Sequence, residues 1–273
     1  MTDLETQDQI KYSILASGST GNATYIETPH RRILVDAGLS GKKIEERMAQ
    51  INRSLADVDG IFVTHEHSDH IQGVGVLARR YNLPIYANAG TWAAMRDKIG
   101  KINPEQQFEL PPASVLDLGD LQVESFAVSH DAAQPQFYQL HHDQQALCII
   151  TDTGYVSEQV AGTIRNADAY LMECNHDPEM LRNGPYTWSL KQRILGDEGH
   201  LSNEEGAEAL MDVIGPQTKQ VVLGHRSQHN NYRELAHLTV QGILQAQGLG
   251  VDHDFQLWDA EPDQPLPLRS VNS

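Results

Sequence analysis

The stretch Thr64-His65-Glu66-His67-Ser68-Asp69-His70 directly follows the apolar run Gly60–Val63, which predicts a buried strand. A strand end that leads into a helix start turns the backbone, so three imidazoles and a carboxylate can converge on metal. His65 and His67 can then point to one ion, while Asp69 and His70 can address a second ion beside it. The alternative is a polar, solvated loop that happens to contain histidine. The H-x-H-x-D-H spacing after a buried strand favours the metal site.

Three further candidate ligands stand at the ends of predicted strands. They are His130 after Gln122–Ser129, Asp152 after Ala146–Thr151, and His225 after Val221–Gly224. Each of them alone is more often a turn residue. Together with the motif they complete a candidate set for two ions, and Asp152, which is followed by Gly154, is suited to bridge them.

The rest of the chain alternates strands and helices. Predicted strands are Tyr12–Ala16, Ala23–Glu27, Arg32–Asp36, Gly60–Thr64, Pro84–Ala87, Ser114–Leu118, Gln122–Ser129, Phe137–His141, Ala146–Thr151, Ala169–Glu173 and, as the final one, Lys219–Leu223. Predicted helices are Ser40–Ile51, His70–Tyr81, Thr91–Ile99, Ser157–Arg165, a helix capped by Ser202 and Glu205 that runs to Ile214, and Tyr232–Gln245. This order predicts the α/β class and an αββα sandwich, two sheets between helical layers, in one domain over residues 1–273.

Composition narrows the function classes. The 273 residues are 40% hydrophobic, enough for a large core, and no apolar run is long enough to cross a bilayer. Met1–Gln9 is polar and acidic, unlike a signal peptide, so a cytoplasmic protein without membrane partners is expected. The two cysteines, Cys148 and Cys174, are expected to be buried structural thiols. A net charge of −17 disfavours non-specific binding of nucleic acid through a basic surface.

The ligand pattern resembles the metallo-β-lactamase superfamily, and the resemblance spans nearly the whole chain. It implies that His65, His67 and His130 hold one metal, that Asp69, His70 and His225 hold the other, and that Asp152 bridges them. Cys174 does not match a ligand position in this resemblance, which argues against a β-lactamase of the zinc-cysteine kind.

Outlying motifs narrow the resemblance to the YycJ/WalJ-like branch. They are Ser17-Gly18-Ser19-Thr20-Gly21-Asn22, Glu173-Cys174-Asn175-His176-Asp177, Gly199-His200-Leu201-Ser202-Asn203, and Gly224-His225-Arg226-Ser227 with Asn230-Asn231. Membership of this branch implies a 5′→3′ exonuclease activity on DNA, with ribonuclease-type and cyclic-phosphodiesterase enzymes as relatives. The long insert of the β-CASP nucleases is absent from this chain, which leaves less surface for gripping a polymer.

Candidate substrate-binding residues are Ser19, Asn22, His176, His200 and Ser227. The turn at Ser17–Asn22 can offer donors to a phosphate, and the two histidines could donate to phosphoryl oxygens or protonate a leaving alkoxide. The alternatives are a tight hairpin for the turn, a helix start at His176 and a brace of the Ser202 cap at His200. Four basic residues could form a rim or a merely solvated face; they are Arg182, Lys191, Arg193 and Arg226.

The mechanistic hypothesis is hydrolysis of a phosphodiester by a metal-bridging hydroxide, with Asp69 orienting the nucleophile as the catalytic residue. Two divalent ions are expected, zinc or manganese, with iron not excluded by an imidazole and carboxylate ligand set. The expected partner is DNA or a small phosphodiester. Alternatives are a small-molecule ester, thioester, lactone or cyclic phosphodiester hydrolase, and a non-enzymatic or redox protein. The physiological substrate and oligomeric state stay open at this point.

Overall fold

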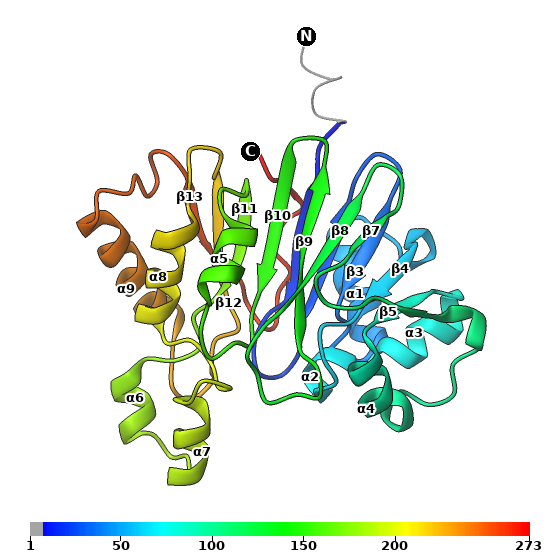
Figure 1. Ribbon diagram of the computed structural model, residues 1–273, viewed down its shortest axis with the longest axis horizontal. Helices are drawn as coiled ribbons and strands as arrows, with labels where there is room; N and C mark the ends of the chain where they lie inside the picture. The colour runs from blue at the N-terminus through cyan, green and yellow to red at the C-terminus, as the bar shows by residue number, and fades with distance from the viewer. Residues whose placement is uncertain (1–7) are drawn as a thin grey trace.

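Two seven-stranded mixed sheets form the centre of the molecule (Figure 1). The computed structural model describes residues 8–273, so most of Met1–Gln9 lies outside the described residues. The first sheet has the order β14 (Arg269–Ser270), β1 (Lys11–Ala16), β2 (Ala23–Glu27), β3 (Arg32–Val35), β4 (Gly60–Phe62), β5 (Ile85–Ala87) and β6 (Gln107–Glu109). The second has the order β13 (Gln256–Asp259), β12 (Gln220–Gly224), β11 (Ala169–Glu173), β10 (Gln145–Ile150), β9 (Gln136–His142), β8 (Gln122–Ala127) and β7 (Val115–Asp117).

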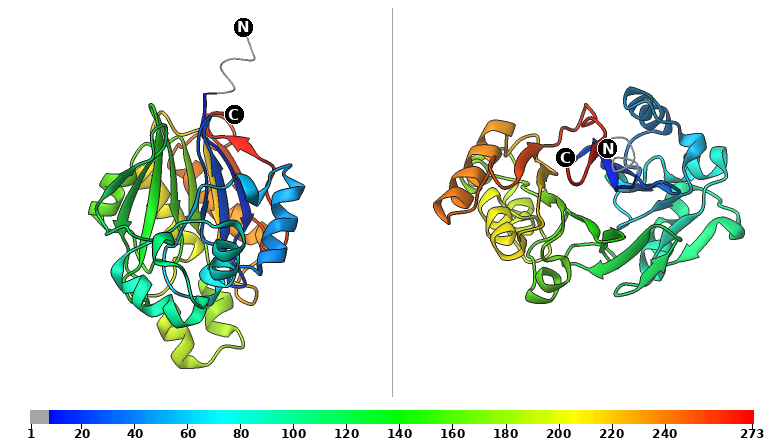
Figure 2. Two further views of the ribbon diagram at one scale, coloured as in Figure 1. Left: turned by 90° about the vertical axis from the view of Figure 1, so that its right-hand side faces the viewer. Right: turned by 90° about the horizontal axis from the view of Figure 1, so that it is seen from above.

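Helices cover the outer side of each sheet, as the views in Figure 2 also show. Beside the first sheet lie α1 (Gly41–Gln50), α2 (Ser68–Ile71), α3 (Val74–Tyr81) and α4 (Ala89–Ile99), with short 3-10 helices at Leu55–Asp57 and Pro104–Gln106. Beside the second lie α5 (Glu158–Ile164), α8 (Asn203–Val213) and α9 (Arg233–Ala246). The predicted αββα sandwich is therefore confirmed. Within residues 8–273, no helix combines the length and apolar character that crossing a membrane requires.

Apolar side chains fill the space between the sheets and the space under the helices. Between the sheets, the rings of Phe62 and Tyr138 meet edge to face at 5.6 Å, and the Tyr138 hydroxyl donates to the Val63 carbonyl at 2.7 Å. Under the helices, Ile44 of α1, Leu77 of α3 and Met95 of α4 are fully buried against the first sheet. Burial on both faces explains why the strands are largely apolar instead of alternating.

Strand direction gathers the ends of four strands at one edge of the second sheet. β10, β11 and β12 pair in parallel. β9 runs antiparallel to both β8 and β10, so β8 points the same way as these three strands. The carboxyl ends of all four strands therefore meet at a single edge, where open α/β sheets commonly bind ligands.

Most predicted elements are present, with small shifts of their ends, and three expectations are corrected. The helix expected over His70–Tyr81 is divided into α2 and α3, because the Gly73 amide donates to the Ala37 carbonyl at 2.7 Å instead of to a carbonyl of α2. Lys219–Leu223 is not the last strand, since β13 and β14 follow and extend opposite sheets. Two helices were not predicted, α6 (Pro178–Asn183) and α7 (Trp188–Ile194), which project from the body below α8 in Figure 1. The capping box of Ser202 and Glu205 is confirmed.

Candidate metal centre

The motif lies where β4 ends and α2 begins. His65 and Glu66 occupy the connecting turn, His67 is the N-cap residue of α2, and Asp69 and His70 stand in its first turn. The single helical turn is held against the first sheet, because the Ala37 amide donates to the His70 carbonyl at 2.9 Å. The local backbone therefore turns as the sequence predicted.

The structure brings all seven candidate ligands together. The side chains of His65, His67 and His130 each offer a ligand atom within 4.8 Å of the others, and so do Asp69, His70, Asp152 and His225. These are the two groups that the superfamily resemblance implies. Asp152 lies between them, with Oδ2 at 3.2 Å from Nε2 of His70 and Oδ1 at 4.0 Å from Nε2 of His130.

Four of the five imidazoles are oriented through Nδ1. His70 donates to Asp36 at 2.7 Å, His130 donates to the Gly199 carbonyl at 3.1 Å, and His225 donates to Glu173 at 2.9 Å. Nδ1 of His65 donates to the Thr64 hydroxyl at 3.0 Å, since that hydroxyl itself donates to Asp36. Because Nδ1 is occupied in each ring, Nε2 is the nitrogen that remains to bind a metal, the arrangement typical of metal-binding histidines. Nε2 of His70 also lies 3.0 Å from Nδ2 of Asn22. His67 differs, because its Nδ1 faces Nε2 of His130 at 3.3 Å.

Three buried atoms of the candidate ligands make no hydrogen bond within the described part of the chain. They are Nε2 of His65, Oδ2 of Asp152 and Nε2 of His225. Leaving a buried acceptor unsatisfied costs about 1–3 kcal/mol, so an unsatisfied group requires an explanation. Imidazole nitrogens and a carboxylate oxygen that converge without partners fit divalent cations.

Backbone conformation directs two of these ligands inward. Asp152 and His225 both have left-handed backbone angles, with φ of 49° and 54°. Asp and His tolerate this region better than most residues, but strain of this kind persists only where the surrounding structure demands it. At His225 the amide donates to the Ser17 hydroxyl at 2.8 Å, which fixes the turn after β12.

The carboxylates and imidazoles of the site shift one another's pKa values. Burial lowers the pKa of His225, but neighbouring carboxylates, that of Asp152 foremost, raise it to about 10. Burial raises the pKa of Glu173, but the imidazoles of His200 and His225 lower it to about 2. Burial likewise opposes ionisation of Asp152, yet charges on His225 and His70 hold its pKa well below the ordinary value. The carboxylates thus stay ionised despite their burial, and ionised carboxylates beside imidazoles are ligands that a divalent cation can replace protons on.

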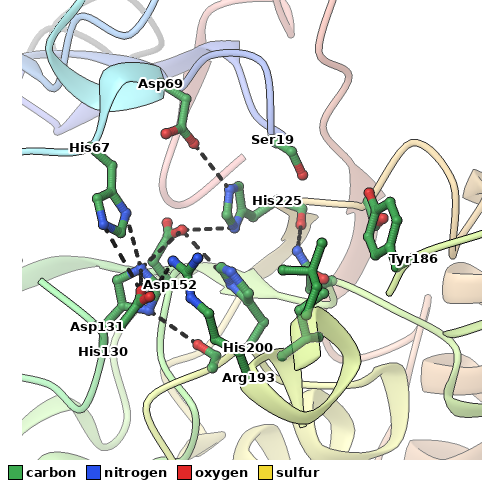
Figure 3. Close-up of a pocket in the computed structure, with 15 residues that line it drawn as sticks. Ser19, His67, Asp69, His130, Asp131, Asp152, Tyr186, Arg193, His200 and His225 are labelled. Atoms are coloured by element: carbon green, nitrogen blue, oxygen red, sulfur yellow. Dashed lines mark hydrogen bonds and ion pairs between the residues drawn. The ribbon is translucent and has the colours of Figure 1, made fainter. Parts of the chain in front are cut away.

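A cavity of about 240 Å³ opens over the centre (Figure 3). Among the predicted substrate-binding residues, Ser19, His200 and Ser227 line this cavity. Two predicted substrate-binding residues do not. Asn22 is buried. Its backbone amide donates to the Asp69 carbonyl at 2.8 Å, and its Nδ2 donates to the Asp69 carboxylate at 3.3 Å, so Asn22 holds Asp69 in position. His176 is fully buried in the bridge to Ser202 and does not border the cavity.

The basic residues do not form a common rim. Arg226 points inward to the Ala260 carbonyl at 2.6 Å, and Lys191 is buried against backbone carbonyls. Arg182 pairs with Glu179 at 2.6 Å. Arg193 alone of the four lines the cavity, where it forms an ion pair with Asp131.

Sequence reasoning missed the residues that support the ligands. Glu173 accepts hydrogen bonds from both His225 and His200 through one oxygen, at 2.9 and 2.8 Å, and Asp36 holds His70 and Thr64. Tyr186, Leu190 and Arg193 line the cavity from the unpredicted α6–α7 segment. Glu173 stands at the end of an apolar strand, the same signal that identified Asp152 and His225, and could have been found by it.

This fold and this arrangement of imidazoles and carboxylates define a class of protein. A family model described as a Beta-lactamase superfamily domain matches residues 31–225, and the chain belongs to this superfamily. The exodeoxyribonuclease WalJ of Streptococcus pneumoniae strain D39 is 53% identical over 263 residues, which cover 96% of this chain and 98% of the relative. The exodeoxyribonuclease YycJ of Bacillus anthracis is 50% identical over 262 residues, covering 96% and 99%. The family suggested by the sequence motifs, one of hydrolytic enzymes, is thereby confirmed.

A solved structure supports the fold independently. The metallo-beta-lactamase fold protein YhfI from Bacillus subtilis matches with a TM-score of 0.70 and covers 95% of this chain and 99% of that protein. Its sequence identity is 14%, so the likeness concerns the fold alone.

Proposed function

We propose that the chain is a dinuclear metal-dependent exonuclease that removes nucleotides from the 5′ end of DNA. The observation that carries this proposal is the convergence of seven imidazole and carboxylate ligands with unsatisfied inward atoms. Identity of 50–53% over nearly full length to two exodeoxyribonucleases supports DNA as the substrate.

In this proposal His65, His67 and His130 hold one ion, and Asp69, His70 and His225 hold a second ion. Asp152 is shared between them. Two divalent ions, zinc or manganese with iron as a further option, would lower the pKa of water and neutralise charge on the phosphoryl group.

The chain's own residues would orient the reactants. Asp69 lines the cavity and is braced by Asn22, so its carboxylate can orient a water for attack on phosphorus. His200 is held by Glu173 through Nδ1 and is partly open to the cavity. In its imidazolium form it would also carry a proton on Nε2, which could be donated to a phosphoryl oxygen or to the departing alkoxide. The hydroxyls of Ser19 and Ser227 supply further donors.

The test compares the wild type with Asp152→Ala. Bound metal is measured by elemental analysis, and each protein is offered duplex and single-stranded DNA labelled at one end. With the wild type only, DNA labelled at its 5′ end is expected to release the label immediately as a mononucleotide. DNA labelled at its 3′ end is expected to give a ladder of progressively shorter products. A 5′ phosphorothioate cap should block both signals. Metal-loaded wild type that leaves every DNA intact would refute the nuclease assignment while retaining the metal centre.

A second candidate is hydrolysis of a small ester, thioester or cyclic phosphodiester. The net charge of −17 favours it, because such a field repels polyanions but does not hinder small substrates. Rates on bis-p-nitrophenyl phosphate, a cyclic nucleotide and a thioester, each compared with the DNA rate, distinguish the two candidates.

A further inference from the structure

The α6–α7 segment forms one wall of the cavity, although it does not belong to the layered core. The segment lies between β11 and α8 in the chain. The cavity-lining residues that it carries are Tyr186, Leu190, Arg193 and Ile194. The last three have helical spacing on one face of α7. In Figure 3, Tyr186 lies on the other side of His225 from His67, so the cavity extends from the metal ligands toward an aromatic ring.

The turn that presents Tyr186 is fixed by its neighbours. Nζ of the buried Lys191 donates to the carbonyls of Arg182 and Gly184 at 2.7 and 2.8 Å. A Cβ on Gly184 would lie 2.3 Å from Oδ1 of Asn230, so the turn packs directly on the loop after β12. The rings of Tyr186 and His229 meet at 5.7 Å and nearly perpendicular. The wall is therefore preorganised, which reduces the entropy lost on binding.

The wall presents little positive charge to the cavity. Of the three cations in residues 178–195, Arg182 pairs with Glu179, Lys191 binds backbone carbonyls, and Arg193 alone lines the cavity. A chain of net charge −17 therefore has little cationic surface here for a DNA backbone. Proteins can instead hold single strands by stacking bases on aromatic rings, which does not depend on sequence.

We propose that the α6–α7 wall binds the terminal nucleotide of a single strand. Tyr186 stacks on the base beside the scissile phosphodiester, and Arg193 exchanges its ion pair with Asp131 for a backbone phosphate oxygen. This inference rests on the proposed nuclease function and adds to it a preference for single-stranded or frayed ends. Leu190, between these two residues in the chain, supplies apolar contact to the sugar.

The first experiment measures stacking without cleavage. Metal-loaded protein is mixed with a single-stranded oligonucleotide that carries 2-aminopurine at its 5′ end and phosphorothioates at its first linkages. Fluorescence quenching is expected with the wild type and with Tyr186→Phe, and it should be lost with Tyr186→Ala. Trp188→Ala is the matched control, because Trp188 is 64% exposed and does not line the cavity. Equal quenching by wild type and Tyr186→Ala would overturn the proposal.

The second experiment uses turnover. Tyr186→Ala is expected to raise the KM for single-stranded DNA about 5- to 150-fold. An abasic 5′ nucleotide should raise the wild-type KM similarly and add nothing to the effect of Tyr186→Ala. Additive effects of the two changes would contradict stacking. If the wild type digests no DNA, the proposed function fails, whereas normal digestion with an unchanged KM for Tyr186→Ala refutes only this inference.

The role of Arg193 has its own readout. For single strands the logarithm of the binding constant falls with the logarithm of salt concentration by roughly 0.7 for each neutralised phosphate. Arg193→Gln should reduce that slope by about this amount. Arg182→Gln, which removes a cation from the same segment but away from the cavity, should not. Equal slopes for wild type and Arg193→Gln would overturn the phosphate contact.

Discussion

The Oε1 atom of Glu173 lies 2.9 Å from Nδ1 of His225, and the same oxygen lies 2.8 Å from Nδ1 of His200. Both imidazoles donate to this fully buried carboxylate, whose other oxygen accepts the Thr153 amide at 2.9 Å. One residue thus sets the orientation of a candidate metal ligand and of a candidate substrate-binding histidine.

Glu173→Gln is expected to weaken metal affinity by about 10- to 100-fold. The amide carries no charge, and if its oxygen faces the two imidazoles, its NH2 group opposes the Thr153 amide, which is itself a donor. Competition with a chelating dye measures the affinity. Glu124→Gln serves as the control, since Glu124 bonds His141 at 3.1 Å on β8 and β9, away from the site. Unchanged affinity in Glu173→Gln would mean that Glu173 does not support the ligands.

Chelation is expected to lower the thermal stability of the protein. Removing cations leaves Asp69, Asp152 and Glu173 close together in a largely buried site. A ligand present at about 1,000 times its Kd stabilises the folded state by about 4 kcal/mol. Melting curves recorded with EDTA, and again after adding back zinc or manganese, measure the effect. Asp152→Ala should respond much less to EDTA; an equal response in both proteins would place the bound metal elsewhere.

Two helical glycines should respond oppositely to alanine. Gly242 lies inside α9 with nothing within 4 Å of a Cβ built on it, so Gly242→Ala should raise the free energy of unfolding by about 1 kcal/mol. Gly75 in α3 packs on α4, where a Cβ would lie 1.9 Å from the Ile99 carbonyl oxygen. Gly75→Ala should therefore destabilise the protein. Urea denaturation measures both changes, and a loss of stability in Gly242→Ala would contradict the packing described here.

His142 is expected to make stability depend on pH. Burial lowers its pKa, but hydrogen bonds from the ring to the Asp120 carbonyl at 2.6 Å and the Asp8 carboxylate at 3.0 Å raise it above the ordinary value of 6.5. Protonated His142 therefore stabilises the fold below its unfolded pKa, and this contribution is lost as pH rises through the folded pKa.

Unfolding of wild type and His142→Gln between about pH 5.5 and 9 measures this contribution, with the difference expected to be largest at the acidic end. His253→Gln, at a ring whose side chain is 89% exposed, should show no such trend. If the difference in the free energy of unfolding between wild type and His142→Gln grew toward alkaline pH, protonation of His142 would destabilise the fold, contrary to this prediction.

The sequence by itself determined the class of fold and the composition of the candidate centre. One short stretch of the chain contains His65, His67, Asp69 and His70, so their convergence depends mainly on local backbone geometry. The remaining candidate ligands, among them His130 and Asp152, follow apolar runs, and such runs indicate strand ends without knowledge of their neighbours. Local hydrogen bonding likewise made the Ser202 cap predictable.

Tertiary structure alone decided how those ligands are supported and what faces them. Glu173 and His225 are 52 positions apart and meet because β11 and β12 are parallel and end at one edge. His176 carried the same local signal as His200, yet one is fully buried and the other partly open to the cavity. α6 and α7 are too short to be stable alone, and Lys191 ties them together through carbonyls. Contacts between residues distant in sequence decide which ring nitrogen is left free, how exposed a ring is and whether a short helix forms. A local sequence pattern does not contain these contacts.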